Sequence, residues 1–544
     1  MDLTLGFRLT LFLAFVSLPV ILAQDIGTAK ILVDGTKRVA EIDDNFICAT
    51  IDWWPRDKCD YNQCPWGNTS VINLDLSHPL LAKAIQAFNH LRIRIGGSLQ
   101  DQVVYNVGNL RYPCHPFRKM KDGLFGFSKG CLYMRRWDAL NHFFSKTGVI
   151  VTFGLNALYG RHKLKGNAWG GDWDSSNARS LMNYSISKGY QIDSWELGNE
   201  LTGNGVGASV GAELYGKDLI KLKSFMNSLY KESKLKPSLI APGGFYDQEW
   251  FAKLLQVSGS NVVNFVTHHI YNLGAGNDPS LVKRILDPSF LSRISETFNS
   301  LHQTIQHNGP WASAWVGESG GAFNSGGRHV SDSFMDSFWY LDQLGMASKF
   351  NTKAYCRQTL VGGNYGLLNT ATFVPRPDYY SALLWHRLMG KGVLAVRTGD
   401  SPHLRSYAHC SKGRAGITLL LINFSNQTRF VINVENLMNV NLPANGRKIQ
   451  SQNSFVHSVK KTVAWVGSKA SNGPLYREEF HLTAKDGNLQ SETSVLNGVP
   501  LVLTDHGEIP KLAPVLNNVH SPLNIAPYSI AFIVLPNFDA PACA

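Results

Sequence analysis

Short apolar runs bounded by turn-forming residues recur along the first two thirds of the chain. Such runs are typical of strands that are buried on both faces of a parallel sheet. Eight of them can be marked, at Phe46–Ile51, Leu91–Ile95, Val149–Leu155, Ser194–Leu197, Leu239–Pro242, Val262–Thr267, Ala314–Val316 and Lys353–Cys356. The pattern therefore predicts a set of buried parallel strands.

Helical patterns lie between these runs. Leu81–His90, Leu219–Leu229 and Ser333–Leu344 repeat apolar residues every three or four positions, as the buried face of a helix requires. Strands alternating with helices in this number predict an α/β fold, a (β/α)8 TIM barrel over residues 41–390. Asp101–Arg136 carries neither pattern, and we expect it to form a long loop or insertion after the second strand.

The pattern changes after about residue 390, where helical periodicity becomes weak. The β-rich runs there are short and separated by turn residues: Val393–Arg397, Gly416–Asn423, Arg429–Val434, Val499–Leu503 and Ile530–Leu535. They predict a C-terminal antiparallel β-sandwich domain over residues 391–544. Lys30–Val33, within residues 24–40, is expected to add an N-terminal strand to that sandwich.

The first 23 residues resemble a secretory signal peptide. Arg8 precedes an uncharged, mostly apolar run from Leu9 to Leu22, and Ala23 is a small residue suited to cleavage. A membrane-spanning helix needs about 20 apolar residues, and neither this run nor any later one reaches that length. We expect a mature chain without a transmembrane segment, with an uncleaved anchor as the alternative.

Sequons and cysteines agree with secretion. The candidate glycosylation sites are Asn68, Asn183, Asn423 and Asn426, of which the last two are too close for both to be used. The eight cysteines fit an oxidising compartment. Cys59 and Cys64, and likewise Cys114 and Cys131, are near enough in sequence to pair, although sequence leaves the connectivity open.

The formal net charge of +12 indicates which partners the surface favours. A basic surface attracts anions, and for a secreted protein acidic polysaccharides are better candidates than nucleic acid. A purely colloidal role of the charge in keeping the protein in solution is the alternative.

Two glutamates follow apolar strand-like runs, in Trp195–Glu200 and in Trp315–Gly320. Parallel barrel strands all end at one face, and catalytic side chains come from those ends. A glycosidase needs one protonated carboxyl group and one ionised carboxylate. Glu200 suits the proton donor, with Asn199 beside it to hold substrate, and Glu318 suits the nucleophile. The alternative is that both acids only cap the following helices.

Other residues near strand ends give weaker signals. His268 and His269 are adjacent and point to opposite faces of a strand, so they cannot chelate one metal together, although one of them could line the pocket. Tyr271 lies where its hydroxyl could hold the nucleophile ionised, or it could simply pack. Neither a zinc-binding motif nor a convincing nucleotide-binding motif is present, so we expect no metal and no cofactor.

Several motifs at successive strand ends resemble the heparanase family of glycoside hydrolases, family 79. The resemblance runs from about residue 40 to the C-terminus and is closest to the plant heparanase-like β-glucuronidases. It rests on Arg94–Ser98, Phe153–Leu158, Trp195–Glu200, Gly317–Glu318, Ser331–Asp332 and Gly363–Tyr365.

This resemblance implies retaining hydrolysis of β-linked glucuronic acid. By position, Glu200 matches the family's proton donor and Glu318 its nucleophile, and Tyr271 would support the nucleophile. Sugar hydroxyls would be held by Asp52, Asn156 and Asn199. The glucuronate carboxylate would be bound by Tyr365 with backbone N–H groups near Asn324 and Ser325, a donor set that holds an anion without a salt bridge.

Two segments depart from animal heparanase. Ala322–Gly326 replaces a Gly-rich run after the nucleophile, and Gly243–Asp247 lacks the arginines that contact sulfated sugars there. These departures favour removal of glucuronic acid from a plant-type glycan such as an arabinogalactan, or from a small glucuronide, over endo-cleavage of heparan sulfate. Excision of Asp101–Arg136, as a linker is excised in animal heparanase, stays open.

The sequence therefore predicts a secreted, glycosylated, retaining β-glucuronidase. The expected location is extracellular, in the cell wall, with peripheral membrane association left open and lysosome or vacuole as alternatives. Two other functions remain: a barrel glycosidase for a neutral sugar, such as an arabinofuranosidase, and a non-catalytic protein that binds acidic polysaccharides.

Overall fold

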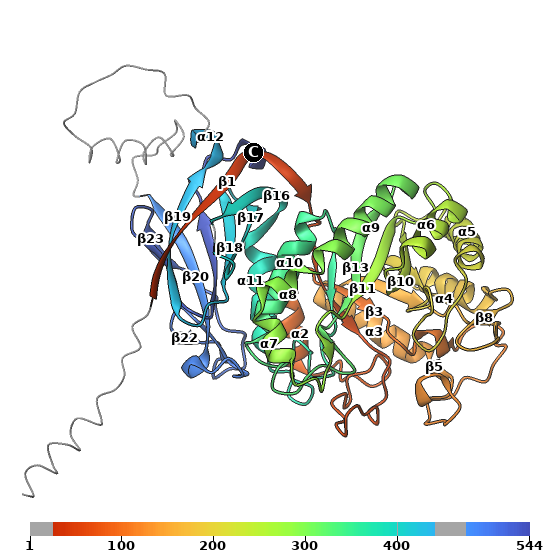
Figure 1. Ribbon diagram of the computed structural model, residues 1–544. Helices are drawn as coiled ribbons and strands as arrows, with labels where there is room; N and C mark the ends of the chain where they lie inside the picture. The colour runs from red at the N-terminus through yellow and green to blue at the C-terminus, as the bar shows by residue number, and fades with distance from the viewer. Residues whose placement is uncertain (1–24, 400, 441–474) are drawn as a thin grey trace, which may run out of the picture.

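Eight parallel strands close into a barrel, with helices on its outside (Figure 1). The computed structural model describes residues 25–399, 401–440 and 475–544, so the predicted signal peptide lies outside the described residues. Around the barrel the strands are β2 (Ile47–Ile51), β3 (Arg92–Ile95), β6 (Ile150–Leu155), β9 (Ile192–Leu197), β10 (Ser238–Phe245), β11 (Phe265–Ile270), β13 (Ser313–Ser319) and β15 (Tyr355–Arg357). Each overlaps one of the predicted runs, which confirms the barrel.

Helices follow the barrel strands in the alternating order that the sequence predicts. They are α2 (Pro79–Gln86), α3 (Met134–Thr147), α4 (Ser176–Ser187), α5 (Ala212–Leu229), α6 (Gln248–Ser258), α7 (Leu281–Ile285), α8 (Pro288–Ser292), α9 (Ser295–Asn308), α10 (Asp336–Lys349) and α11 (Pro377–Leu388). The connection from β11 to β13 is the one that carries several helices, α7, α8 and α9.

The segment Asp101–Arg136 is more ordered than the loop we expected. It holds the short strands β4 (Val103–Tyr105) and β5 (Gly130–Leu132), which pair in parallel, and the 3-10 turn η2 (Leu124–Gly126). The turn η1 (Gln100–Gln102) overlaps its start, and α3 begins before its end. Short pieces of this kind leave no periodicity that a sequence could reveal.

The C-terminal strands form a second, eleven-stranded sheet. Along its path lie β22 (Val499–Pro500), β21 (Ser494–Leu496), β20 (Tyr476–Ala484), β25 (Ser529–Leu535), β18 (Ile417–Asn423), β17 (Leu404–Ser411), β16 (Met389–Thr398), β1 (Asp25–Glu41), β19 (Thr428–Asn436) and β24 (Leu523–Ile525), with β23 (Val515–Asn518) beside β20. The N-terminal strand β1 lies antiparallel to β16 and parallel to β19.

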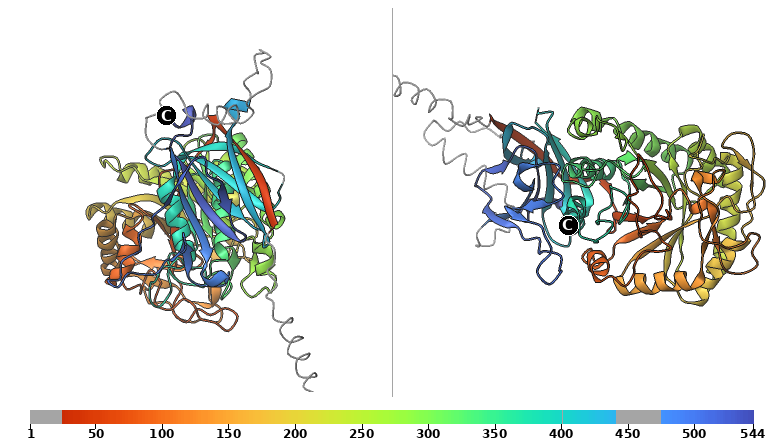
Figure 2. Two further views of the ribbon diagram at one scale, coloured as in Figure 1. Left: turned by 90° about the vertical axis from the view of Figure 1, so that its left-hand side faces the viewer. Right: turned by 90° about the horizontal axis from the view of Figure 1, so that it is seen from below.

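This sheet packs on both of its faces. In β18, Leu419 and Leu421 belong to a core that two parts of this sheet enclose between them. Residues of β1 and β19 contribute to the same core. Leu420 and Ile422 point the other way and join the large core shared with the barrel. Helices α10 and α11 lie between barrel and sheet (Figures 1 and 2), and nearly all of their residues are buried. The two parts therefore share one hydrophobic core.

Smaller elements complete the described chain. They are the two-stranded pairs β7 (His162–Lys163) with β8 (Trp169–Gly170) and β12 (Gly274–Ala275) with β14 (Ala322–Phe323), helix α12 (Leu437–Val440), and the turns η3 (Lys485–Gly487) and η4 (Pro541–Cys543). Among the described helices, none is both long and apolar enough to cross a bilayer.

All eight cysteines are paired in four disulfides. Cys59–Cys64 and Cys114–Cys131 confirm the local pairings expected from spacing. Cys410–Cys543 joins β17 to the C-terminus. Cys48–Cys356 joins β2 to β15, the first and last barrel strands, which pair at these two residues.

Removing the barrel disulfide is expected to destabilise the protein by about 2–4 kcal/mol, because a cross-link restricts the unfolded chain more when it closes a longer loop. The double variant Cys48→Ala/Cys356→Ala opens a loop of 308 residues, whereas the control Cys59→Ala/Cys64→Ala opens one of 5. Urea unfolding midpoints measure the difference. A larger loss of stability in the control than in the barrel variant would contradict this expectation.

Candidate active site

The barrel brings the two predicted glutamates to one site. Glu318 lies near the end of β13, and Glu200 follows β9 by three residues. One carboxylate oxygen of each, and one ring nitrogen of His269, lie within 4.8 Å of one another. The side chains are almost enclosed, at 6% exposure for Glu200 and 5% for Glu318. Retaining glycosidases hold their two carboxyl groups about 5–5.5 Å apart, and inverting ones about 6.5–9.5 Å, so a pair of oxygens within 4.8 Å of each other is nearer to the retaining spacing.

The backbone of Glu200 holds an unusual conformation. Its φ is 55°, in the left-handed region that costs a residue with a side chain about 1–2 kcal/mol. Two hydrogen bonds keep it there: its N–H donates to the Gly243 carbonyl at 2.6 Å, and its carbonyl accepts from Val206 N–H at 2.9 Å. Strained backbone of this kind gathers at functional sites, where the surrounding structure enforces it.

Burial gives Glu200 the protonation behaviour of a general acid. Burial away from water raises the pKa of its carboxyl group to about 7, although the positive charge of Arg94 acts to lower it. His269 Nδ1 lies 2.9 Å from Glu200 Oε1. Burial also lowers the pKa of His269 to about 4, so the ring is neutral near pH 7 and cannot drive ionisation of Glu200 by its charge. His268 points the other way, packing on Phe298 of α9.

Two donors hold Glu318, one on each carboxylate oxygen. The Tyr271 hydroxyl donates to Oε1 at 2.6 Å, and Arg94 Nη1 donates to Oε2 at 3.0 Å. Both bonds fix the orientation of the carboxylate, as a nucleophile requires. Burial and the neighbouring Glu318 charge raise the pKa of Tyr271 well above its usual value, so the phenol keeps its proton and remains a donor.

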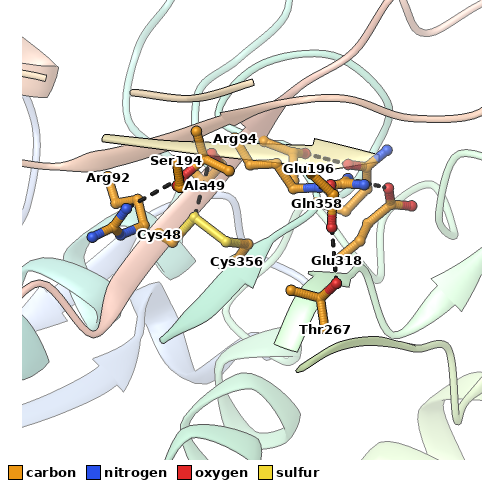
Figure 3. The surroundings of a disulfide bond; sticks show 12 residues. Cys48, Ala49, Arg92, Arg94, Ser194, Glu196, Thr267, Glu318, Cys356 and Gln358 are labelled. Carbon is orange, nitrogen blue, oxygen red and sulfur yellow. Dashed lines mark hydrogen bonds and ion pairs between the residues drawn. A yellow bond between two sulfur atoms is a disulfide. The ribbon is translucent and has the colours of Figure 1, made fainter. Parts of the chain in front are cut away.

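Arg94 is the central residue that the sequence reasoning did not assign to the site. Figure 3 shows it against both Glu196 and Glu318. Its Nε donates to Glu196 Oε2 at 2.6 Å, and its Nη2 donates to the Asn199 side-chain oxygen at 2.9 Å. Thr267 donates to the other oxygen of Glu196 at 2.9 Å. The signal in the sequence was a pair of arginines, at positions 92 and 94, inside a run that otherwise reads as apolar.

The Asn199 side chain has one donor atom left unpaired in the site. Its backbone N–H donates to Asp101 Oδ2 at 2.8 Å, and its side-chain oxygen is held by Arg94. The side-chain Nδ2 is buried with no partner among the described residues. A donor left unpaired beside Glu200 is suited to a ligand oxygen, because an unmet buried donor is costly.

Asp52 and Tyr365 lie close to Glu318. Asp52 accepts from Trp53 N–H at 2.6 Å and from Gln358 Nε2 at 3.0 Å. Burial, and next the charge of Glu318, raise the pKa of Asp52 to about 7. Burial also raises the pKa of Tyr365 well above its usual value, with Asp52 and Glu318 adding to the effect, so Tyr365 stays a neutral donor.

Glycine at position 97 allows the close approach of Asp52. A Cβ there would lie 2.3 Å from Asp52 Oδ2, and its φ of 104° is one that other residues rarely adopt.

Asn156 uses its side chain to hold the local backbone. Its Nδ2 donates to the Val103 carbonyl at 2.9 Å, and its Oδ1 accepts from Leu158 N–H at 2.8 Å. The predicted contact of Asn156 with a sugar hydroxyl is therefore left to its second amide hydrogen and to the second lone pair of Oδ1. Asp101, which the sequence reasoning placed in a loop, accepts from the N–H groups of Ala157 and Asn199 and so fixes two strand ends together.

Asn324 and Ser325 line a cavity of about 280 Å³ that Glu200 and Glu318 do not line. Both have positive φ values, 56° and 70°. The Ser325 hydroxyl donates to Asp60 at 2.5 Å, and Asn324 Nδ2 donates to the Tyr61 hydroxyl at 3.1 Å. Besides the second amide hydrogen of Asn324, the segment has backbone N–H groups to offer an anion. Arg328 is the cation that lines the same cavity.

Within the part of the chain that the structure describes, two groups of side chains have donor atoms close enough to hold a metal ion. The first is Glu200, His269 and Glu318, and the second is His329, Asp332 and Glu492. In the first, Arg94 and Tyr271 already occupy both oxygens of Glu318, and a guanidinium at this position repels a cation. The hydrogen-bond donors Arg94 and Tyr271 therefore make this group better suited to hold a carboxylate than to bind a metal ion.

The four sequons differ in accessibility. Asn68, Asn183 and Asn426 are exposed. Asn423 is fully buried, and its Nδ2, the atom that a glycan would modify, donates to the Thr428 and Ala526 carbonyls at 2.8 Å each. A glycan on Asn423 is therefore incompatible with this fold, and the prediction for that residue is corrected.

Known proteins are similar to this chain in sequence. The family description "Glycosyl hydrolase family 79, N-terminal domain" matches residues 28–345. Heparanase-like protein 1 of Arabidopsis thaliana is 64% identical over 546 residues, which cover 99% of this chain and 100% of that protein. Baicalin-beta-D-glucuronidase of Scutellaria baicalensis is 39% identical over 513 residues, 92% of this chain and 90% of that protein.

A solved structure shows the same fold. The glycoside hydrolase family 51 arabinofuranosidase of Xanthomonas axonopodis pv. citri superposes with a TM-score of 0.61 over 93% of this chain and 99% of that chain, at 14% identity. At that identity the likeness concerns architecture alone.

Proposed function

Because the chain belongs to glycosyl hydrolase family 79, we propose that this glycoside hydrolase is a secreted, retaining β-glucuronidase. Its substrates would be glycans such as arabinogalactan, or small glucuronides, from which it removes β-linked glucuronic acid. The observation that carries the proposal is the asymmetric carboxyl pair: Glu200 with its pKa raised to about 7, and Glu318 held by two donors, with oxygens within 4.8 Å.

The mechanism is a double displacement. Glu318 attacks the anomeric carbon and forms a glycosyl ester, while the proton on Glu200 passes to the leaving oxygen. Glu200, now ionised, takes a proton from water, and the resulting hydroxide displaces Glu318 from the anomeric carbon. Glucuronic acid leaves in the β configuration, and both carboxyl groups return to their starting states.

Two further observations support a glucuronide substrate. One relative, at 39% identity, bears the name baicalin-beta-D-glucuronidase. The formal net charge of +12 favours the approach of an anionic ligand over long distances. Tyr365 would receive the glucuronate carboxylate together with the N–H groups of the Asn324 segment, whose cavity is also lined by Asn364, next to Tyr365 in the chain.

The test uses the purified protein on a panel of β-glucuronides, including glucuronidated arabinogalactan, with chromogenic arabinofuranoside as the neutral-sugar alternative. Mass analysis should detect free glucuronic acid, and proton NMR of the first product should show the β anomer. Release of arabinose without glucuronate would favour the neutral-sugar glycosidase. Salt-sensitive binding of acidic glycan without any release would favour the non-catalytic alternative.

Substitution of Tyr365 by Phe tests recognition of the substrate carboxylate. A hydrogen bond to a charged group contributes about 1.5–3 kcal/mol, so kcat/KM for an aryl β-glucuronide should fall at least about tenfold. The matching aryl β-glucoside lacks the carboxylate and should lose much less. Equal losses on both compounds would remove Tyr365 from carboxylate recognition.

Secretion and glycosylation belong to the same proposal. Complete pairing of the cysteines is the state expected in an oxidising compartment such as the cell wall. The exposed sequon residues Asn68, Asn183 and Asn426 would carry the glycans.

A further inference from the structure

Two exposed apolar side chains come from the segments that contact Glu200. Phe245 is the last residue of β10 and is 41% exposed, and Val206 lies in the loop after Glu200 and is 37% exposed. The Val206 N–H donates to the Glu200 carbonyl at 2.9 Å, and the Phe245 carbonyl accepts from Thr202 Oγ1 at 2.8 Å. These bonds fix the backbone of Val206 to Glu200 and that of Phe245 to Thr202, two residues after Glu200.

The Phe245 ring packs on the residues that hold the two glutamates. Its centroid lies 6.2 Å from the Tyr271 ring and 6.4 Å from the His269 ring. Tyr271 donates to Glu318, and His269 contacts Glu200. One part of the ring thus contacts the catalytic site, while the rest stays open to solvent. An aromatic face left open beside a polar site can stack on a ring of a bound ligand.

The chemistry of cleavage says which part of the substrate meets this surface. Glu200 gives its proton to the glycosidic oxygen, so the group attached to that oxygen, the aglycone, must lie beside Glu200. Glucuronate itself lies toward Glu318, Asp52 and Tyr365. The apolar surface of Phe245 and Val206 therefore falls on the leaving-group side.

The two segments that carry this surface offer no cation to a sulfated aglycone. Residues 201–207 and 243–247 contain neither Lys nor Arg, and the charged residue among them is Asp247. Asp247 accepts from Trp250 N–H at 3.0 Å and caps α6. A sulfate placed here would meet a carboxylate and an apolar surface, whereas a neutral ring could stack on Phe245.

We propose that Phe245 and Val206 form the aglycone subsite, which binds the ring next to the glycosidic oxygen through that ring's uncharged, apolar face. The subsite rests on the glucuronidase function proposed above and adds the class of leaving group: a flat aromatic ring, or a sugar ring presenting its C–H face. Phe245 is a specificity-determining residue in this scheme and takes no part in proton transfer.

The test compares Phe245→Ala with the native enzyme on two glucuronides that differ only in the aglycone. 4-Methylumbelliferyl β-D-glucuronide presents a ring, and methyl β-D-glucuronide does not. Loss of the stacking contact should lower kcat/KM about tenfold for the first compound and less than about twofold for the second. Phe245→Trp should keep both values. Tyr476→Ala, equally exposed at 42% but on β20 of the second sheet, is the matched control and should change neither.

Equal losses on both compounds would show that Phe245 only supports Tyr271 and His269, and no loss on either would show that no ring binds there. Both results overturn the subsite. If the native enzyme cleaves neither compound, the glucuronidase proposal fails first and the subsite with it.

Two disaccharides complete the experiment. A loss by Phe245→Ala on glucuronosyl-galactose would extend the subsite to sugar rings, and a loss confined to the aryl compound would assign it to aromatic aglycones. Glucuronosyl-glucosamine in its N-acetylated form should be cleaved faster than in its N-sulfated form. Preference for the sulfated form would overturn recognition through an uncharged face.

Discussion

Replacement of Glu318 by Gln is expected to lower kcat on β-glucuronides by at least about 10⁴-fold, while the protein stays folded. The amide has almost the same shape and can still contact Tyr271, but it cannot attack the anomeric carbon. Loss of a covalent nucleophile costs factors of this size in other hydrolases. Release of 4-methylumbelliferone under saturating substrate measures kcat, and unchanged circular dichroism verifies the fold.

Chemical rescue separates a nucleophile from a residue that merely positions others. In Glu318→Ala the side chain is gone, so added azide can enter and attack the anomeric carbon directly. The expected product is glucuronosyl azide of inverted, α configuration, because a single displacement replaces the double one. Glu249→Gln, on the exposed start of α6, is the control and should leave kcat unchanged. Full activity of Glu318→Gln would refute the assignment.

Replacement of Glu200 by Gln should lower kcat by about 10²–10⁴-fold for glucuronides with poor leaving groups, since these need a proton. The native enzyme should lose kcat/KM as pH rises through about 7, where the Glu200 carboxyl group ionises. Because the general acid must be protonated to act, the enzyme is active below this pKa and inactive above it. In Glu200→Gln that alkaline limb should vanish.

The leaving group provides the control for the acid. A 2,4-dinitrophenyl leaving group needs no proton, so formation of the glycosyl ester should be nearly as fast in Glu200→Gln as in the native enzyme, and a burst of dinitrophenol should precede slow hydrolysis. Equal damage to substrates with good and poor leaving groups, or an unchanged alkaline limb, would contradict the role of Glu200.

The sequence predicted the barrel because its strands have a local signature. Parallel strands buried on both faces need unbroken apolar runs, and each run ends in a turn. The ends of those runs then located Glu200 and Glu318, since all strand ends meet at one face. The second sheet was harder. Strand β20 contains Arg477 and Glu479, both buried and paired at 2.6 Å, so its composition resembles that of a solvent-exposed segment.

By itself, then, the sequence determined the order of the barrel strands, the two carboxyl groups and the local disulfides, because each depends on spacing along the chain. Only the tertiary structure decided that Arg94 reaches Glu196, Asn199 and Glu318, that His269 contacts Glu200, and that Cys48 meets Cys356. It also decided that Asn423 is buried. These facts depend on residues far apart in sequence being enclosed together, and burial is what shifts the pKa of Glu200 toward that of an acid catalyst.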